Sequence, residues 1–515
     1  MPLNSVVTCG EPNSLTFPEG FSSCGPAQWK RMELTYPKLL RTDAYLNGQW
    51  VAAEDGRTFA VHDPFTNEVL TEVADLGAKQ TERAIGAATD AFPAWCKRTA
   101  EARSRLLRKW YELLLQHQED LAYLMTREQG KPLSESRGEV SYGASFIEWF
   151  AEEGRRAYGD IIPAHREDTR ILTLKQPVGV VAAITPWNFP IAMITRKVAP
   201  ALAVGCTVVV KPAEDTPLCA LALAQLADQA GIPPGVFNVV PTSRPREVGE
   251  VLTQDARVRK LSFTGSTATG KQLMAQSAGT LKKLSLELGG NAPFIVFDDA
   301  DIEGGVAGAM VSKYRNGGQT CVCANRIYVQ SGVYDRFVTA LALAVQRLRV
   351  GNGLDEATDI GPLINTAALE KVERLVADAV AKGAEVRLGG QRLPIADRAY
   401  APTLLEGVDA SMEIAQEEVF GPVAPVFRFA TEEEVIALAN DTPYGLAAYF
   451  YGRDHARIWR VAEALDYGMV GINTGLISTA VAPFGGVKES GFGREGSKYG
   501  LEEYLVTKYL CWGGL

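Results

Sequence analysis

Histidine is scarce in this chain of 515 residues, which contains only four: His62, His117, His165 and His455. None of the four lies near the cysteine motif described below, so the sequence does not suggest the Cys–His pair of a cysteine protease. Cys321 and Cys323 are separated by one residue, a spacing too short for two ligands of an ordinary zinc site without further Cys or His nearby. We therefore expect no metal site.

Positive charge is not in excess either. The 52 Lys and Arg residues are outnumbered by 61 Asp and Glu residues, which gives a formal net charge of -9. This balance argues against non-specific binding of nucleic acid and against a basic helix on a membrane surface. The longest apolar runs, residues 178–185 and 199–210, are broken by Gly, Pro or polar residues well short of a bilayer span. We expect no nucleic-acid partner and no transmembrane segment.

Cysteine occurs eight times without the dense spacing of a disulfide scaffold. This usage indicates a reducing compartment, with the cytoplasm as the default location. Residues 1–31 lack helical or strand periodicity and lack the apolar core of a secretory signal, so we expect a disordered tail there. With 46% hydrophobic and 22% charged residues, the rest is expected to form a globular protein of two or three domains.

Strand and helix patterns alternate along most of the chain. Residues 45–63 contain two strand-like strings, which are expected to form a hairpin with its turn at Asn47-Gly48. Amphipathic helices are predicted over residues 78–92, 100–116, 120–129 and 135–158. Strand-like runs at 180–185, 207–211, 236–240, 260–263 and 283–286 then alternate with helical runs at 191–204, 218–229, 246–252 and 268–276. This alternation predicts βαβ units and a parallel sheet with a nucleotide at the carboxyl ends of its strands.

A second series of the same kind follows from Pro293. Strands are predicted near residues 294–297, 326–329 and 423–427, and helices at 302–314, 334–348, 366–381, 432–440 and 456–464. The predicted fold class is therefore α/β, with two domains and a cleft between them.

Cys321 is the predicted nucleophile. The string from Arg315 to Arg326 surrounds it with two glycines and small polar residues, and such a backbone can pack tightly around a substrate. A thiolate attacks a carbonyl carbon well and also leaves well, so a covalent thiol intermediate suits aldehyde or acyl chemistry. The alternative is that Cys321 is a small buried hydrophobic residue, as isolated intracellular cysteines commonly are.

Two further residues are candidates for catalysis. Glu287 ends a strand among apolar residues beside two glycines, where desolvation would raise its pKa towards the range of a general base. A structural ion pair or a solvent-facing rim position is the competing interpretation. Asn188, between two prolines at the end of the first parallel strand, could donate to a developing oxyanion. Its competing role is to cap the following helix.

Two strings favour nucleotide binding. Residues 263–270 link a strand to a helix through Gly265, Ser266 and Gly270, and free backbone N–H groups at a helix N-terminus can receive a phosphate. A glycine-rich turn of this kind is weak evidence alone, because it can be purely structural. Lys211 and Glu214 lie at the end of an earlier strand, where an ammonium and a carboxylate could grip ribose hydroxyls or simply form a solvated ion pair.

Taken together, these strings resemble the NAD(P)-dependent aldehyde dehydrogenase family over nearly the whole chain after Met32. The strings that carry the resemblance are Pro186-Trp187-Asn188-Phe189-Pro190, Lys211-Pro212-Ala213-Glu214, Leu286-Glu287-Leu288-Gly289-Gly290, Gly318-Gln319-Thr320-Cys321 and Glu418-Val419-Phe420-Gly421-Pro422. They occur in the order that the family has.

The resemblance implies a fold and an assembly. A Rossmann-type cofactor domain would comprise residues 32–158 and 179–286, and an α/β catalytic domain residues 287–478. Residues 159–178 and 479–515 would form a small strand-based oligomerisation region, in which residues 171–174 and 504–506 are strands that need a partner. A homodimer or homotetramer is therefore expected.

The resemblance also implies roles for individual residues. Cys321 would be the nucleophile and Glu287 the base that activates the deacylating water, while Asn188 and the Cys321 backbone N–H would form the oxyanion hole. The implied cofactor-binding residues are Trp187, Lys211, Glu214, Gly265, Ser266, Gly270, Glu418 and Phe420. The expected reaction is thiolate addition to the aldehyde, loss of hydride to the nicotinamide, and hydrolysis of the thioester.

Within the family, the chain is most similar to the succinate-semialdehyde dehydrogenases. This likeness assigns Arg196, Arg315 and Ser478 to a distal carboxylate of the substrate, and a guanidinium suits a carboxylate because the pair can be bidentate. Interdomain ion pairs are the alternative for each arginine. Glutarate semialdehyde, one methylene longer, remains open, because one methylene separates substrates by only about 1–3 kcal/mol. A coenzyme A-acylating dehydrogenase is a more distant alternative, against which Glu287 argues.

The cofactor and a redox switch are the last expectations. Glu214 would accept a hydrogen bond from a ribose 2′-hydroxyl but would repel a 2′-phosphate, so NAD is favoured, and Lys211 keeps NADP possible. Similar family members can form a disulfide between cysteines placed like Cys321 and Cys323. The alternative is that Cys323 only packs in the interior.

Overall fold

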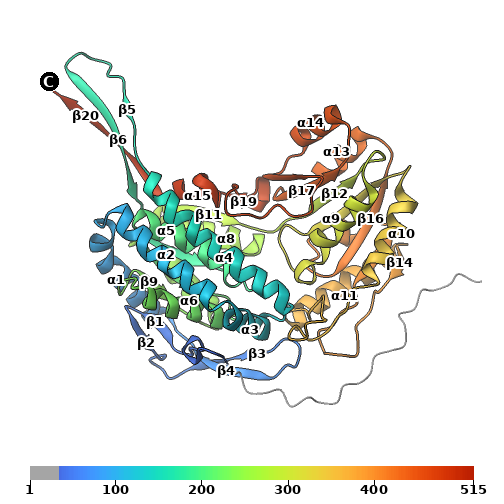
Figure 1. Ribbon diagram of the computed structural model, residues 1–515, viewed down its shortest axis with the longest axis horizontal. Coiled ribbons are helices and arrows are strands. Elements are labelled where there is room, and N and C mark those ends of the chain that lie inside the picture. Colours follow the sequence, from blue (N-terminus) through green and yellow to red (C-terminus); the bar gives the residue numbers. More distant parts are fainter. Residues whose placement is uncertain (1–33, 515) are drawn as a thin grey trace, which may run out of the picture.

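The computed structural model describes residues 34–514, which form two α/β bodies and a projecting arm of three strands (Figure 1). The expected tail, residues 1–31, lies outside the described residues. Two short strands outside these sheets, β3 (Thr58–His62) and β4 (Val69–Ala74), pair only with each other. The predicted α/β class is confirmed.

The first body is built on an eight-stranded sheet with the order β19-β11-β10-β7-β8-β9-β1-β2. Its parallel strands are β7 (Val180–Ile184), β8 (Thr207–Lys211), β9 (Phe237–Val239), β10 (Val258–Thr264) and β11 (Lys283–Glu287). The antiparallel edges are β1 (Ala44–Leu46), β2 (Gln49–Val51) and β19 (Gly491–Phe492). All five strands expected in this region are present.

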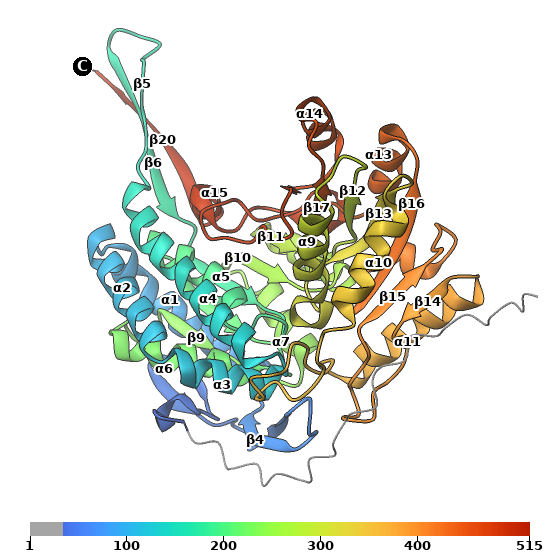
Figure 2. The ribbon, with the colours of Figure 1, turned by 45° about the vertical axis from the view of Figure 1, so that its right-hand side comes forward.

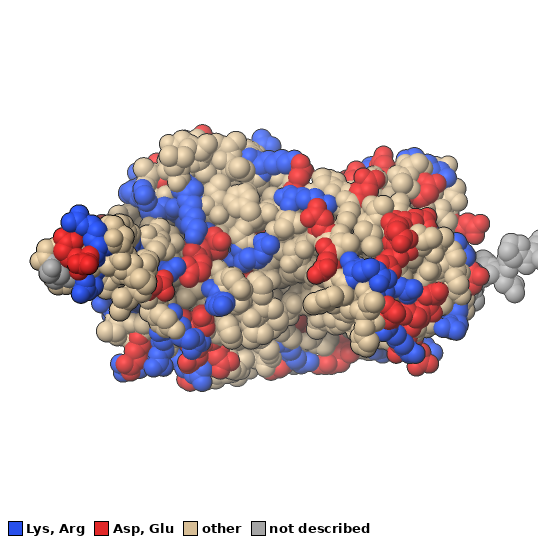
Figure 3. All heavy atoms as spheres, turned by 90° about the horizontal axis from the view of Figure 1, so that it is seen from above, with Lys and Arg blue, Asp and Glu red and all other residues tan. Residues whose placement is uncertain are grey.

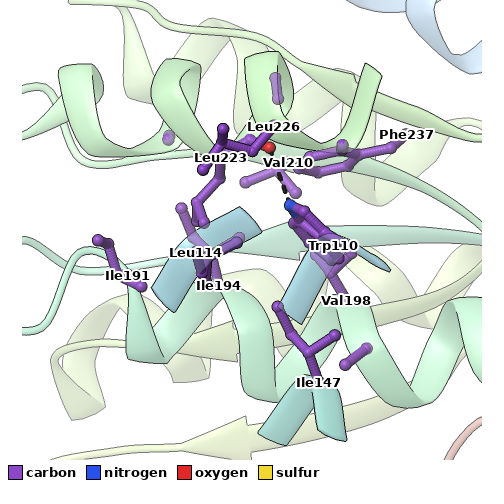
Figure 4. Close-up of a cluster of buried hydrophobic side chains, with 14 of the residues drawn as sticks. Trp110, Leu114, Ile147, Ile191, Ile194, Val198, Val210, Leu223, Leu226 and Phe237 are labelled. Atoms are coloured by element: carbon purple, nitrogen blue, oxygen red, sulfur yellow. Dashed lines mark hydrogen bonds between the residues drawn. The ribbon is translucent and has the colours of Figure 1, made fainter. Parts of the chain in front are cut away.

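Helices surround this sheet because their apolar stripes pack on it. They are α1 (Ala78–Cys96), α2 (Ala100–Gln116), α3 (Gln118–Gln129), α4 (Leu133–Glu153), α5 (Ala192–Val204), α6 (Pro217–Ala230), α7 (Pro245–Gln254) and α8 (Thr267–Ser277). Figure 4 shows part of the resulting core, in which Trp110 of α2 lies against α6 and Phe237 of β9. The indole N–H of Trp110 donates to the carbonyl of Leu223 at 3.2 Å, so this large buried side chain leaves no polar atom unsatisfied.

The order of the parallel strands places a ligand site. The chain runs from β7 outward to β8 and β9, then crosses to β10 and β11 on the other side of β7. Helices on either side of such a reversal diverge and leave a crevice at the carboxyl ends of the two central strands. Here those strands are β7, which ends before Asn188, and β10, which ends before Gly265.

The second body has a seven-stranded sheet with the order β14-β15-β16-β13-β12-β17-β18. The strands are β12 (Ala292–Val296), β13 (Ala324–Gln330), β14 (Glu385–Leu388), β15 (Thr403–Glu406), β16 (Val423–Phe429), β17 (Ala447–Tyr451) and β18 (Met469–Ile472). Helices α9 (Ile302–Tyr314) and α10 (Tyr334–Val345) cover one face, and α11 (Thr366–Ala381), α13 (Glu432–Asn440) and α14 (His455–Ala464) cover the other (Figure 2). The remaining helices are α12 (Glu413–Gln416) and α15 (Ser497–Glu502).

The arm consists of β5 (Ile161–Ile162), β6 (Thr169–Pro177) and β20 (Leu505–Gly513) in the order β20-β6-β5, and it projects from the first body (Figure 1). Strands expected around residues 171–174 and 504–506 are confirmed by the antiparallel pairing of β6 with β20. Large apolar side chains on the arm face solvent, among them Ile161 at 83% and Trp512 at 65% exposure. In Figure 3, acidic and basic side chains are mixed over the face of the molecule seen from above.

One expectation about strand pairing is wrong. The turn at Asn47-Gly48 does join β1 to β2, but the string at residues 58–62 pairs with β4 instead of joining that hairpin. The error arises because the partner of a short strand is determined by contacts remote in sequence. Residues 491–492 form β19 and pair with β11. No helix among residues 34–514 is both long and apolar enough to span a bilayer.

Candidate active site

Cys321 lies in a tightly constrained loop between α9 and β13. A short 3-10 segment, Arg315–Gly318, follows α9, and its Asn316 and Gly318 have positive φ values of 51° and 75°. A Cβ on Gly318 would lie 2.2 Å from the Gly421 carbonyl oxygen, and a Cβ on Gly290 would lie 2.6 Å from the Cys321 carbonyl oxygen. Glycine at these positions therefore lets two other segments approach the loop closely.

Asn188 meets this loop from the other body. It is buried, and its Nδ2 donates to the Gln319 carbonyl at 3.1 Å. One N–H of the amide stays available, because Nδ2 carries two donors. The alternative role of Asn188, capping the following helix, is excluded. The N-cap residue of α5 is Ile191, and Asn188 neither donates nor accepts a capping hydrogen bond there.

A cavity of about 480 Å³ opens at the crevice between the carboxyl ends of β7 and β10 and reaches the thiol. Its lining includes the predicted residues Trp187, Asn188, Gly265, Ser266, Cys321, Glu418 and Phe420. Trp187 and Phe420 meet edge to face with ring centroids 5.6 Å apart. A largely apolar hollow with a few polar groups at a strand-order reversal suits a nucleotide, so these residues fit the expected dinucleotide.

Ser266, which lines this cavity, also caps α8 by accepting a hydrogen bond from the Thr269 N–H. The remaining predicted cofactor residues, Gly270, Lys211 and Glu214, lie away from the cavity. Gly270 does not line the cavity, and a Cβ there would lie 2.4 Å from the Leu288 side chain, so its local effect is close helix–strand packing. Lys211 donates to Glu214 at 3.2 Å, and Glu214 lines a separate hollow of about 310 Å³.

Glu287 occupies a buried position at the end of β11. Neither of its carboxylate oxygens has a hydrogen-bond partner among the described residues. Burial, followed by the charge of Glu495, raises the pKa of Glu287 well above its usual range, against the opposing charges of Arg196 and Lys197. Both of these cations pair with Glu495. The ion-pair interpretation of Glu287 is therefore not supported, and a carboxyl group with free oxygens remains beside the site.

The thiol of Cys321 carries its proton at neutral pH in this arrangement. Desolvation raises its pKa to about 12, the charges of Glu418 and Glu287 add to this, and Arg196 and Arg315 oppose it. Glu418 accepts a hydrogen bond from the Gly290 N–H at 3.1 Å, and burial raises the pKa of Glu418 to about 7. A base must therefore take the thiol proton when the nucleophile reacts.

The two predicted arginines differ in their surroundings. Arg196 is buried, its guanidinium lies 4.4 Å from the centre of the Phe484 ring, and it pairs with Glu495. Arg315 lies 5.4 Å from the Phe189 ring and forms no ion pair among residues 34–514. Ser478 is half-buried in the segment after β18, between Ile477, which packs on the core of the second body, and Ala480, which belongs to that of the first.

Sequence reasoning missed four polar residues that surround this site: Tyr142, Lys131, Glu139 and Glu495. The Tyr142 hydroxyl is buried without a hydrogen-bond partner in the described chain. Burial raises the pKa of Tyr142, and the charges of Arg196 and Arg315 oppose this shift. Lys131 and Glu139 form a buried ion pair. Glu139 could have been predicted from the sequence, because it is a charged residue on the apolar face of a helix. No comparable sequence pattern marks Glu495.

Cys323 lies in the interior behind the loop. Its Sγ is 3.4 Å from the Lys313 carbonyl oxygen, and both it and Cys321 are free thiols. A disulfide between them stays a prediction. Across residues 34–514, no group of three or more His, Cys, Asp or Glu side chains is arranged to hold a metal ion.

A thiol that lines a largely apolar cavity at a strand-order reversal, with a buried carboxyl group and an amide near it, is the arrangement expected of an oxidoreductase that works through an enzyme-bound thiol. The chain belongs to the aldehyde dehydrogenase family, whose model matches residues 50–510. Enzymes of this family oxidise aldehydes with NAD or NADP.

Similar proteins cover almost the whole chain. It is 60% identical over 484 residues to a glutarate-semialdehyde dehydrogenase from Pseudomonas aeruginosa, covering 94% of this chain and 100% of that protein. It is 59% identical over 482 residues to an NADP(+) succinate-semialdehyde dehydrogenase from Escherichia coli, covering 94% and 100%. The crystal structure of a succinate-semialdehyde dehydrogenase from Burkholderia pseudomallei, 58% identical, covers 93% of this chain and 100% of its own with a TM-score of 0.93.

Proposed function

We propose that the protein oxidises succinate semialdehyde to succinate with NAD(P), through a thioester on Cys321. The observation that carries the substrate assignment is the guanidinium of Arg315, which has no ion-pair partner in the described chain and whose charge acts on the Cys321 thiol. A buried or half-buried cation without a partner favours an anionic ligand, because desolvated charges are costly when unpaired. Relatives that act on semialdehydes with a distal carboxylate support the same assignment.

The first half-reaction forms a carbon–sulfur bond. The Cys321 thiol gives its proton to a base as sulfur adds to the aldehyde carbon. In this proposal the base is the ionised form of Glu287, whose oxygens are free and whose raised pKa makes it a stronger base. The resulting alkoxide receives hydrogen bonds from the free N–H of Asn188 and the backbone N–H of Cys321. When the cofactor is bound, it supplies the acceptor for the hydride that leaves this carbon.

The second half-reaction breaks the thioester. Glu287 first releases the thiol proton to solvent and then takes a proton from a water molecule, whose oxygen adds to the acyl carbon. The sulfur of Cys321 leaves and takes this proton back from Glu287. The products are the free acid and the resting thiol. A coenzyme A-acylating enzyme would instead transfer the acyl group to another thiol, and the free carboxyl oxygens of Glu287 beside the site favour water.

The distal carboxylate is held by Arg315 in this proposal, with Arg196, Tyr142 and Ser478 around it. Arg196 shares its charge with Glu495, whereas the Tyr142 hydroxyl has a donor to offer. A charge-assisted hydrogen bond from a guanidinium both binds and orients a carboxylate.

Glutarate semialdehyde is the second candidate, and it is favoured by the 60% identity to a glutarate-semialdehyde dehydrogenase. The two substrates differ by one methylene, which a pocket separates by only about 1–3 kcal/mol. Arg315 serves either substrate.

NAD is the preferred cofactor in this proposal. Lys211 and Glu214 are hydrogen-bonded to each other at the carboxyl end of β8, and Asp215 beside them adds a second carboxylate to the hollow that Glu214 lines. Two acidic groups at a ribose 2′ position would repel the additional phosphate of NADP. The similar enzyme from Escherichia coli is described as an NADP(+) enzyme, so the preference has to be measured.

Oligomerisation through the arm completes the proposal. Strands β6 and β20 carry exposed apolar side chains, among them Leu174, Tyr509 and Trp512. Such a surface is typical of a subunit interface and not of a permanently solvent-exposed surface. A homodimer or homotetramer would cover them. Size-exclusion chromatography with light scattering measures the state directly.

A cofactor-reduction panel tests the function. The substrates are succinate semialdehyde, glutarate semialdehyde and uncharged aldehydes of the same two chain lengths. Their kcat/KM values are compared with NAD and with NADP. The proposal expects succinate semialdehyde to exceed the uncharged C4 aldehyde by about tenfold or more, the value of one charge-assisted contact. Equal kcat/KM for charged and uncharged aldehydes would contradict it, and a higher value for glutarate semialdehyde would favour the second candidate.

A further inference from the structure

We propose that Lys131 and Glu139 are positioning residues for Asn188, so that this buried ion pair sets the geometry of the oxyanion hole. The inference rests on the role proposed above for Asn188. It concerns two residues that do not themselves line the cavity and that act through the backbone of the turn from which Asn188 projects.

The ammonium group of Lys131 holds the carbonyl of Asn188. Its Nζ lies 2.7 Å from the Asn188 carbonyl oxygen and 2.5 Å from Oε2 of Glu139, and it lies 4.1 Å from the centre of the Phe189 ring. An ammonium has three donors, and a carbonyl, a carboxylate and an aromatic face account for all three. The lysine side chain is fully buried. Its environment is therefore complete without a ligand, which indicates a role in holding the protein itself.

Glu139 holds the other end of the same turn. Its Oε1 accepts hydrogen bonds from the backbone N–H groups of Ile191 at 2.9 Å and Ala192 at 3.2 Å. These are among the N–H groups at the start of α5 that have no partner inside the helix, and a carboxylate there also complements the helix dipole. The pair thus fixes the turn on both sides of Phe189 and Pro190.

A second set of contacts ties the turn to the nucleophile loop. Nδ2 of Asn316 donates to the same Asn188 carbonyl at 3.1 Å, and Oδ1 of Asn316 accepts from Nε2 of Gln129 at 3.1 Å. Oε1 of Gln129 in turn accepts from the Lys131 N–H at 2.9 Å. The Asn188 carbonyl is therefore held by a donor from each body, and its amide is set against the loop that carries Cys321.

Stability alone does not account for this pair. Two charges taken out of water cost several kcal/mol each, and well-packed apolar residues of similar size commonly stabilise a protein as well or better. The pair instead fixes the position of the Asn188 amide, because catalytic donors must be held within about 0.5 Å of the productive geometry. A displacement of about 1 Å can cost a hundredfold in rate. The effect should fall on the step that develops the oxyanion, while substrate and cofactor binding change little.

The test uses the double variant Lys131→Met/Glu139→Leu, which removes both charges together and leaves neither unpaired. Stopped-flow formation of NADH in the first turnover is measured with saturating succinate semialdehyde. We expect a rate about 10–100-fold lower, with the KM for aldehyde and the Kd for NAD within about twofold of wild type. The matched control is Arg127→Met/Asp63→Leu, which removes a buried ion pair of 2.8 Å between α3 and the residue after β3. This pair does not contact the turn, so the variant should keep the wild-type first-turnover rate.

A cycle with Asn188→Ala separates the possible outcomes. The triple variant should be no slower than Asn188→Ala alone, because the pair acts through Asn188. The inference would be overturned if the rate loss in the triple variant equalled the product of the losses in the double variant and in Asn188→Ala. It would also be overturned if the double variant folded and kept the wild-type rate. Either outcome would leave the role of Asn188 intact. An unchanged rate in Asn188→Ala would instead overturn the proposed oxyanion hole and this inference with it. If the double variant does not fold, Glu139→Gln decides the question, and a first-turnover rate equal to wild type in that variant would overturn the inference.

Discussion

Arg196 forms a buried ion pair with Glu495, a carboxylate that lies 299 positions further along the chain (495 − 196). Lys197 pairs with the same carboxylate. One carboxylate is thereby shared by two cations. Arg315 forms no ion pair within residues 34–514, and its charge acts on the buried Glu135 carboxyl and on the Cys321 thiol. We expect Arg315 to meet the carboxylate of the substrate.

Replacing Arg315 by Ala should therefore weaken the use of carboxylate substrates selectively. We expect kcat/KM for succinate semialdehyde to fall about 10–100-fold, the value of a charge-assisted hydrogen bond, and to change less than threefold for an uncharged aldehyde of the same length. Arg336→Ala, which removes an exposed arginine of α10, is the control. Equal losses on both aldehydes would exclude carboxylate binding by Arg315.

Glu287→Gln should slow both half-reactions. Because Gln can take a proton neither from the Cys321 thiol nor from water, steady-state turnover should fall about a hundredfold or more. The first turnover of NADH formation should slow as well, so a rapid burst of one equivalent per active site is not expected. Rapid-quench mass spectrometry of the acyl-enzyme checks this, and complete turnover at the wild-type rate would remove Glu287 from the mechanism.

Much of this site is predictable from the sequence because its residues lie in short, contiguous sequence motifs. Strands and helices of the first body follow from patterns within ten to twenty residues, and the order reversal between β7 and β10 then brings Asn188 and Gly265 together. Four strands of the second sheet, β14, β15, β17 and β18, escaped prediction because they are short and gain their stability from neighbouring strands. Glu495 escaped because its contact with Lys197 spans 298 positions, and no local pattern encodes such a contact.

Glu214 should control the choice of cofactor. In Glu214→Ser the repulsion of a 2′-phosphate is reduced, so kcat/KM with NADP relative to NAD should rise about tenfold or more. Glu250→Ser removes the same charge from an exposed position of α7 and should leave the ratio unchanged. A wild-type enzyme that already prefers NADP would show that Glu214 does not exclude the phosphate.

Glu128 should make the stability of the protein depend on pH. It is fully buried and accepts hydrogen bonds from the N–H groups of Leu218 and Cys219 at 2.7 and 2.8 Å. Burial raises the pKa of this carboxyl from its ordinary value of 4.5 to about 8. The folded state therefore binds a proton more tightly than the unfolded state, and the stability that Glu128 contributes is present below pH 4.5 and is lost as the pH rises towards 8.

Glu128→Gln removes this titration. We expect the free energy of unfolding of the variant to depend less on pH than that of wild type between pH 5 and 8, with the variant gaining relative to wild type as the pH rises. Urea titrations at several pH values measure the difference. Identical slopes would show that Glu128 is ionised in the folded protein.

The most direct test of the account is Cys321→Ser, assayed for NADH formation with succinate semialdehyde and for binding of NAD. We expect turnover to fall about a thousandfold or more, because a hydroxyl is a far weaker nucleophile than a thiol, while the Kd for NAD stays within about twofold. Cys96→Ser, at a half-buried cysteine at the end of α1, should retain full activity. Undiminished oxidation in Cys321→Ser would contradict catalysis through a thioester.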